Sequence, residues 1–381
     1  MPRGSEGIAI NRALVTWARE RAGLTLDEAA QKFRHIAAWE DGSALPTYPQ
    51  LESMSDEFKL PIAVFFFPEP PETPPIRESF RTLPDIEFDR LPKAIRFLLQ
   101  KAKALQINLA ELTQNRNPAP RFIANDLQFR STVTPDAMAA RVRGYLGVSL
   151  EAQFAWRDDD EALKAWRFAL QDAGIFIFKD AFRTEGFFGF SLYDDTFPLI
   201  YANNSAAKTR QIFTLFHELG HILFRTSGID THNEEYILGL PDRPQRIEVL
   251  CNRFAAQFLV PDDAFARAMA GQGRDEVTAE RLAATFHVSR ETIYRKFLDR
   301  KWITQRTYER AVAGWNAQRK PGGGGGDFYN TKIAHLGREY IAIAFQQYHK
   351  NRINDEQLAE YLDTKPRNVG RLEEYFTAGA P

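Results

Sequence analysis

The chain has 381 residues, 44% of them hydrophobic and 26% charged, and 49 Lys and Arg against 50 Asp and Glu give a net charge of −1. This balance produces no overall field that would favour nucleic acid or a membrane as partner. No apolar run approaches the roughly 18 residues of a membrane-spanning helix, and the single cysteine, Cys251, excludes an intramolecular disulfide and a multi-cysteine zinc site. The first residues lack the apolar core of a secretion signal. We therefore expect a cytoplasmic protein of more than one domain.

The first half of the chain is predicted to be helical, with one interruption. Residues 1–68 carry apolar residues at the spacing of short helices. A linker is expected over 69–90, because the tract FPEPPETPP at 67–75 can sustain neither a helix nor a central strand. Helical patterns return over 91–165.

The period then changes to that of β-structure. Short aromatic and β-branched runs at 174–179, 187–193 and 198–202 are divided by Gly, Asp and Asn, so they predict three strands of one small sheet. Helices over about 208–225 and 246–259 follow, the second ended by Pro261. These elements outline one compact core within 166–270.

Three further segments complete the predicted organisation. Residues 271–320 are expected to be helical, and residues 328–381 form a C-terminal helical segment. Between them, over 321–327, the tract PGGGGG indicates a flexible hinge.

The strongest motif is FHELGH, at 216–221. His217 and His221 lie four residues apart, so both imidazoles share one face of a helix and can bind one metal ion. Glu218, beside the first of them, can take the proton of a metal-bound water. The alternative is a chance pattern on a structural helix. The preceding sheet and the apolar residues around the motif favour catalysis.

A zinc site of this type needs a third protein ligand and an open position for water. The candidates downstream are Asp230, His232, Glu234, Glu235, Asp242 and Glu248. The stretch 230–235 is expected to be a solvated loop. Glu248 lies on the polar side of the next helix, four residues before Asn252, and is the preferred ligand; an exposed helix charge is the alternative.

The two helices together resemble the ImmA/IrrE family of metallopeptidases. The resemblance covers FTLFHELGHILF, then IEVLCNRFAAQFLVP, together with the strand PLIYANN, Arg210, Glu248, Asn252, Phe254, Ala255 and Pro261. It implies an α+β, mostly helical fold with a zincin-like core, in which a small sheet accompanies the HExxH helix.

The same resemblance implies the roles of the site residues. His217, His221 and Glu248 would bind zinc, and Glu218 would be the general base. Two His and one Glu also admit Mn²⁺, with Zn²⁺ favoured on affinity. Cys251 stands where the family most often has Ala, and we expect a buried, inert thiol there.

Residues 1–68 resemble the Xre-type helix-turn-helix module that is often fused to this peptidase. The resemblance lies in WARERAGLTLDEAAQKFRHIAAWEDGS. The segment between Ala30 and Trp39 is shorter than usual and affects the helix that normally enters the major groove. Arg34 and His35 are the candidate DNA contacts, and a packing or partner-docking module is the alternative.

The helical segment after the core, VTAERLAATFHVSRETIYRKFLDRKWIT, also resembles a helix-turn-helix. Ser289 is expected to cap its second helix, and His287 is expected in the turn. Residues 290–320 hold nine Lys and Arg against three Asp and Glu, which could bind phosphates. Support for the catalytic fold is the favoured interpretation. The tail from Tyr329 resembles the C-terminal helices of longer family members.

The function implied by the resemblance is a zinc endopeptidase that cleaves an Xre-type repressor in a stress, mobile-element or toxin–antitoxin circuit. The strand 198–202 is expected to be the edge that pairs with an extended substrate, and Tyr201 and His232 are candidates for stabilising the oxyanion. The first rival is a DNA-binding regulator or antitoxin-like protein with a structural, non-proteolytic metal site. The second is a stress sensor whose helical modules gate the peptidase. Glu218 favours catalysis over the first rival.

Overall fold

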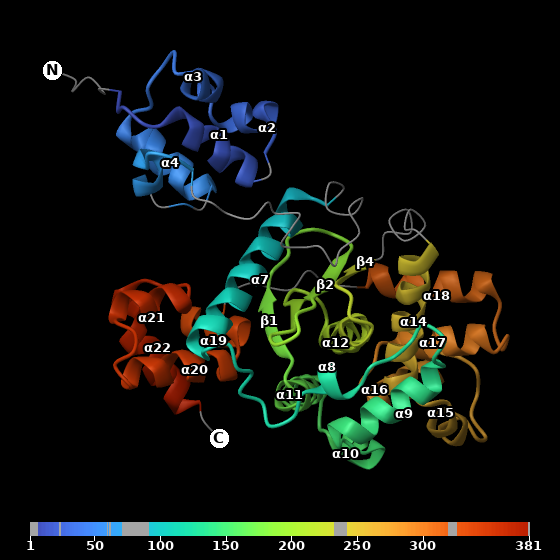
Figure 1. The fold of residues 1–381 in the computed structure, drawn as a ribbon. Helices are drawn as coiled ribbons and strands as arrows, with labels where there is room; N and C mark the ends of the chain where they lie inside the picture. Colours follow the sequence, from blue (N-terminus) through green and yellow to red (C-terminus); the bar gives the residue numbers. More distant parts are fainter. Residues whose placement is uncertain are drawn as a thin grey trace. The chain divides into compact units, whose positions relative to one another are not determined.

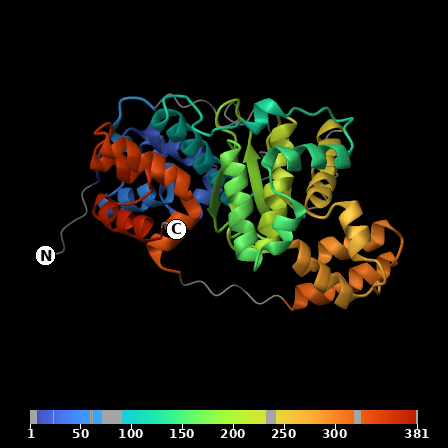
Figure 2. The same cartoon turned by 90° about the horizontal axis from the view of Figure 1, so that it is seen from below.

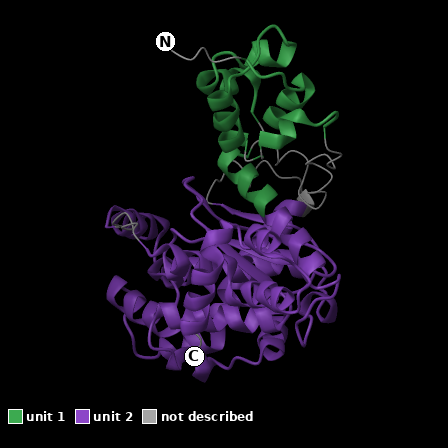
Figure 3. Cartoon of the chain, turned by 90° about the vertical axis from the view of Figure 1, so that its left-hand side faces the viewer, with its two compact units in different colours: residues 1–81, 85–101 green, residues 82–84, 102–381 purple. Residues whose placement is uncertain are grey.

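The computed structural model describes residues 7–22, 24–58, 60, 62–70, 91–231, 242–318 and 326–379. The chain divides into two compact units, residues 1–81 with 85–101 and residues 82–84 with 102–381 (Figure 3). This division falls inside one helix, α7 (Lys93–Leu112). The predicted linker over 69–90 lies outside the described residues except for its first two, and the finer division into segments stays a prediction.

The first unit is helical. Its elements are α1 (Arg12–Arg21), α2 (Leu26–Lys32), α3 (Ile36–Asp41), α4 (Tyr48–Phe58), the 3₁₀ helix η1 (Ile62–Phe66) and the start of α7. Thr25 begins α2 through a capping box with Glu28, and Gly42, in the left-handed region, ends α3. Arg19 of α1 donates to the Glu40 carboxylate of α3 at 2.6 Å, which ties these two helices together beside the apolar core.

The second unit carries the sheet and the remaining helices. Its elements before the sheet are α8 (Ile123–Asp126), α9 (Pro135–Leu146), α10 (Leu150–Ala155) and α11 (Asp159–Asp172). The sheet region holds β1 (Phe176–Asp180), β2 (Phe187–Leu192), β3 (Leu199–Asn203), α12 (Lys208–Leu223) and β4 (Gly228–Thr231). The rest is α14 (Asp242–Leu259), α15 (Asp262–Ala268), α16 (Glu276–Phe286), α17 (Arg290–Asp299), α18 (Gln305–Ala317), α19 (Phe328–Leu336), α20 (Arg338–His349), α21 (Asp355–Tyr361) and α22 (Pro366–Ala378). The mostly helical α+β fold is confirmed.

The strands lie in the order β1-β3-β2-β4, with β1 and β3 parallel and the other pairs antiparallel (Figure 1). The three predicted strands are present, but β3 lies between β1 and β2 and is hydrogen-bonded on both sides. The expectation that residues 198–202 form a free edge for substrate is therefore wrong. Among the described strands, β4 lies at the outer position next to β2. The sequence analysis assigned 230–235 to a solvated loop, yet Asp230 lies in β4 and is 2% exposed.

The two faces of the sheet are covered by different helices (Figures 1 and 2). Ile177 and Ile200 are partners across β1 and β3 and join the core formed with α11 and α12. On the other face, Phe178 packs edge-on against Tyr340 of α20, with ring centroids 5.3 Å apart. The HExxH helix is thus held between the sheet and the helical core.

The helices after the core are docked through side chains that the sequence analysis considered for phosphate binding. Ser289 accepts from the backbone N–H of Thr292 and caps α17, as predicted. His287 ends α16 in the left-handed conformation, which confirms it as a turn residue. Lys296 and Arg300 both contact the Asp262 carboxylate of α15, at 2.8 Å and 2.6 Å, so part of the basic run takes part in packing.

No described helix is both long enough and apolar enough to cross a membrane.

The stability of the second unit is expected to depend on Trp166 of α11. This side chain is fully buried and packs edge-on against Phe216 of α12 and against Phe258 of α14, at centroid distances of 4.9 and 5.2 Å. Trp166→Ala should lower the free energy of unfolding by about 3–5 kcal/mol through the cavity it leaves, measured by urea unfolding. Phe168→Ala, on the same helix but 72% exposed, should change it by less than about 1 kcal/mol. Equal effects would contradict this packing.

Candidate metal centre

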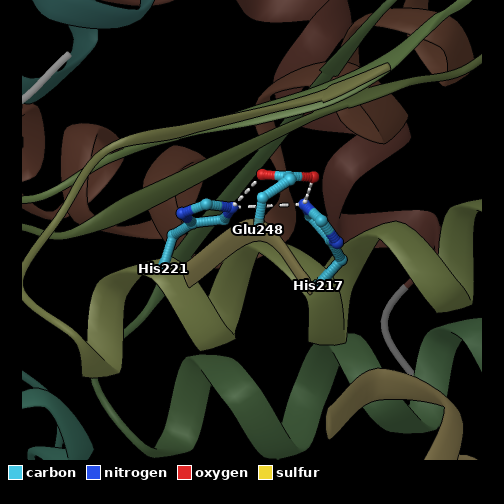
Figure 4. A group of neighbouring side chains, drawn as sticks. All are labelled: His217, His221 and Glu248. Atoms are coloured by element: carbon cyan, nitrogen blue, oxygen red, sulfur yellow. Dashed lines mark hydrogen bonds and ion pairs between the residues drawn. The ribbon is translucent and has the colours of Figure 1, made fainter. Parts of the chain in front are cut away.

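Two histidines of α12 face one another across a turn of the helix. The apolar residues around them are buried, so α12 is a core helix and not a surface one. The spacing of four residues places His217 and His221 on the same face, and their Nε2 atoms lie 3.2 Å apart (Figure 4). Both side chains are buried, with His217 at 0% exposure.

The third member of the group comes from α14. Glu248 Oε1 lies 3.2 Å from His217 Nε2, and Oε2 lies 3.0 Å from His221 Nε2. Its carboxylate spans both imidazoles (Figure 4). Asn252, one turn further along α14, donates to the Glu248 carbonyl at 3.1 Å and approaches Oε1 at 3.4 Å. The carboxylate is therefore oriented by its own helix as well as by the imidazoles.

The close approach of α12 and α14 depends on small and stacked side chains. A Cβ atom on Gly220 would lie 2.9 Å from Cys251 Sγ and 3.3 Å from Cys251 Cα. Phe216 stacks on Phe258 with centroids 4.1 Å apart. Burial raises the pKa of the Cys251 thiol well above its usual value, which fits the expected inert thiol.

The donor set fits a divalent cation. Two imidazole nitrogens and a carboxylate oxygen are the ligands of many zinc sites, and bonds of about 2.0–2.1 Å in tetrahedral geometry separate ligand atoms by about 3.3 Å. The separations of 3.0–3.2 Å observed here are close to that value. The charges agree as well. The carboxylates of Glu218, Asp230 and Glu248 are all buried, and Arg210 pairs with Asp230. A divalent cation bound to the imidazoles would balance the remaining negative charge.

The charges within this group shift the pKa values of its members. Burial by itself would lower the pKa of His217, but the carboxylates of Glu248, Asp230 and Glu218 together outweigh it and raise the pKa to about 10. Burial of Glu248 disfavours its charge, yet the imidazoles of His217 and His221 hold its pKa below the ordinary value. The carboxylate is therefore kept in the ionised form that binds metals.

Glu218 lies on the same helix and is fully buried. Its Oε2 accepts a hydrogen bond of 2.6 Å from Ser191 Oγ of β2, and its Oε1 has no partner among the described residues. Burial raises the pKa of this carboxyl above its ordinary value, more than the two imidazoles lower it. A buried carboxylate with one oxygen held and the other free is suited to accept a proton.

The edge strand β4 is tied to α12 by a second polar group. Arg210 forms an ion pair with Asp230 of β4, and Thr214 Oγ1 donates to the same carboxylate at 2.6 Å. Burial would raise the pKa of Asp230, but the Arg210 guanidinium holds it below its usual value. At the start of β4, a Cβ on Gly228 would meet the His221 ring at 2.3 Å. The strand therefore passes directly over this histidine.

Of the other predicted site residues, Tyr201 is the one described in this unit, and its side chain does not reach this centre. The expectation that Tyr201 stabilises the oxyanion is corrected. Tyr201 lies on the face of the sheet away from α12, stacked on Phe190, and its hydroxyl is 3.3 Å from Asp180. His232 lies outside the described residues. Arg34 and His35 are exposed in the turn between α2 and α3 of the other unit. Ser191, which contacts Glu218, is not predicted from the sequence, where its only signal is a small residue two places from Gly189 in an aromatic strand.

Comparison with known families agrees with this geometry. Residues 171–298 match the Peptidase M78 family, described as the IrrE N-terminal-like domain. The match spans all four strands, α12 and α14, so it includes the two histidines, Glu218 and Glu248. It supports the resemblance to the ImmA/IrrE family and a metallopeptidase-type function. No curated protein matches the chain.

The buried pair of Arg210 and Asp230 should contribute far more to stability than an exposed pair. Asp230→Asn keeps the side-chain shape but leaves the guanidinium without its anion, and we expect a loss of about 3 kcal/mol in the free energy of unfolding. Asp299→Asn breaks a pair with Arg295 whose side chains are 58% and 60% exposed, and should cost less than about 1 kcal/mol. Urea unfolding of the two variants measures both values. A small effect of Asp230→Asn would show that the strand is held by other contacts.

Proposed function

We propose that the chain is a zinc-dependent endopeptidase in which His217, His221 and Glu248 hold the metal and Glu218 is the general base. One observation carries the proposal: two imidazole nitrogens and a carboxylate converge within 3.2 Å of one another, beside a second buried carboxylate that has a free oxygen. The match to the Peptidase M78 family supports it. Mn²⁺ suits the same donors, and Zn²⁺ is favoured on affinity.

The reaction would divide between the metal and Glu218. A zinc ion supplies Lewis acidity toward the scissile carbonyl and lowers the pKa of water. Glu218 Oε1 accepts the proton of the attacking water and passes it to the leaving amine. The raised pKa of Glu218 favours the first of these steps, because a carboxylate with a higher pKa is the stronger base toward the attacking water.

The substrate is proposed to bind along β4. An extended peptide gains affinity by adding to a sheet edge through backbone hydrogen bonds. Among the described strands β4 is outermost on this side, and Gly228 brings it next to His221. A peptide paired there would pass over the metal group.

For the substrate itself we propose an Xre-type transcriptional repressor, whose cleavage would relieve repression in a stress, mobile-element or toxin–antitoxin circuit. The support is the resemblance to the ImmA/IrrE family. A repressor bound to DNA would be met in the cytoplasm, the compartment expected from the sequence.

A second candidate function is a DNA-binding regulator or antitoxin-like protein that does not cleave. It is favoured by the exposure of Arg34 and His35, which leaves both side chains able to contact phosphates or bases. The six residues of α3 argue against it, because so short a helix offers few side chains to a groove. The endopeptidase is therefore the preferred function.

Three proteins test the proposal: wild type, Glu218→Gln and Glu248→Ala. Metal content is measured per chain, and cleavage is followed on Xre-type repressors encoded near the gene. We expect wild type to hold one zinc and to cut. Glu218→Gln should hold zinc and lose at least about 99% of the activity, since removal of a general base typically costs 10²–10⁴-fold. Glu248→Ala should lose most of its zinc.

Two outcomes would contradict the proposal. If Glu248→Ala binds zinc as well as wild type, the ligand assignment is wrong. If the zinc content of each of the three proteins is as expected and no repressor is cut, while wild type retards operator DNA and Arg34→Ala does not, the regulator replaces the endopeptidase.

A further inference from the structure

Ser191 lies at the junction of three parts of the proposed site. It is fully buried on β2, and its register partners are Ile200 of β3 and Gly228 of β4. Its side chain lies on the face of the sheet that α12 covers, since its Oγ is 2.6 Å from Glu218 Oε2. The same oxygen is 3.2 Å from the backbone nitrogen of Gly228.

The direction of both hydrogen bonds follows from the groups involved. A backbone N–H can only donate, so the Ser191 oxygen accepts from Gly228. A hydroxyl has one proton, and the ionised carboxylate of Glu218 can only accept, so that proton is directed to Glu218 Oε2. Ser191 therefore has one arrangement that satisfies all three groups, with the Gly228 N–H fixing the hydroxyl in its donating orientation.

We propose that Ser191 is a positioning residue for the general base: it holds Glu218 Oε2 and so leaves Oε1 as the oxygen that exchanges the proton. The inference rests on the proposed function. The geometry also links the base to the substrate strand, because Gly228 begins β4 and lies against the ring of His221. A displacement of β4 would release the hydroxyl that orients Glu218.

The consequence of losing this hydroxyl differs from that of losing a ligand. Without Ser191 Oγ, the carboxyl group of Glu218 keeps its helix and its burial but can rotate about its last side-chain bonds. The Ser191 hydroxyl bonds to Glu218 and to the Gly228 N–H and not to His217, His221 or Glu248, so metal binding should be unaffected. Loss of the Ser191 hydroxyl should therefore weaken the binding of ligands that form a hydrogen bond with Glu218.

Binding of a hydroxamate reports directly on the orientation of Glu218, and the test needs no knowledge of the natural substrate. Acetohydroxamic acid binds a zinc-type centre and exchanges its proton with a neighbouring carboxylate. Its dissociation constant is measured on the cobalt-substituted protein from the visible absorption bands, for wild type, Ser191→Ala, Glu218→Gln and the double variant. Cobalt content per chain is measured for each.

We expect Ser191→Ala to bind one cobalt per chain and to weaken acetohydroxamate by about five- to tenfold, the size of one ordinary hydrogen bond. Glu218→Gln should weaken it at least as much. In the Glu218→Gln background, Ser191→Ala should add less than about twofold, because the two residues act through one interaction.

Two further variants separate positioning from a general loss of packing. Ser227→Ala removes another buried hydroxyl between β2 and β4, which accepts from the Tyr193 N–H at 3.0 Å, and should leave acetohydroxamate affinity within about twofold of wild type. Ser191→Cys retains a side chain of similar size but offers only a weak S–H donor. It should reproduce the loss, and it keeps the test decisive if Ser191→Ala does not fold.

The outcomes distinguish this inference from the proposed function. If Glu218→Gln weakens the hydroxamate and the Ser191 variants do not, Ser191 has no positioning role and the endopeptidase proposal stands. If the effects of Ser191→Ala and Glu218→Gln multiply, Ser191 acts apart from Glu218 and the inference is overturned. If wild type binds no cobalt, or Glu218→Gln changes nothing, the proposed function itself fails.

Discussion

The close packing of α12 against α14 is the constraint on which the rest of the structure depends. The two histidines share a helix, so their separation is set by the helical repeat alone, but Glu248 reaches them only because the two helices nearly touch at Gly220 and Cys251. The stacked rings of Phe216 and Phe258 hold that contact from the apolar side. A larger residue at position 220 would move the carboxylate away from both imidazoles.

The sheet completes the centre from the other side of α12. Ser191 contacts Glu218, Gly228 passes over His221, and Asp230 anchors the outer strand to Arg210. These contacts place three carboxylates and two imidazoles in a buried volume where unpaired charge is costly. A divalent cation bound to the imidazoles would balance the carboxylates, so the charges and the geometry of the donor set both fit a metal ion.

The features that follow from short-range periodicity could be predicted from the sequence. The spacing of His217 and His221, the first three strands and the helix that carries Glu248 all follow from local patterns. The strand order does not, because nothing local indicates that β3 pairs on both sides; this is why the expected substrate edge and Tyr201 were misplaced. The four residues of β4 are too few to display a period, and the burial of Asp230 depends on Arg210, which is distant in sequence. Ser191 meets Glu218 and Gly228 only once the strands and α12 have packed together, so no local pattern marks it.

The most direct test of the account is X-ray absorption at the zinc edge of the purified full-length protein, with zinc content per chain measured on the same sample. The account predicts one zinc per chain, a first shell of nitrogen and oxygen only at about 2.0–2.1 Å, and the scattering signature of two imidazoles. The absence of zinc would contradict it. A sulfur ligand at about 2.3 Å, which could come only from Cys251 or a methionine, would show that the centre is not the one formed by His217, His221 and Glu248.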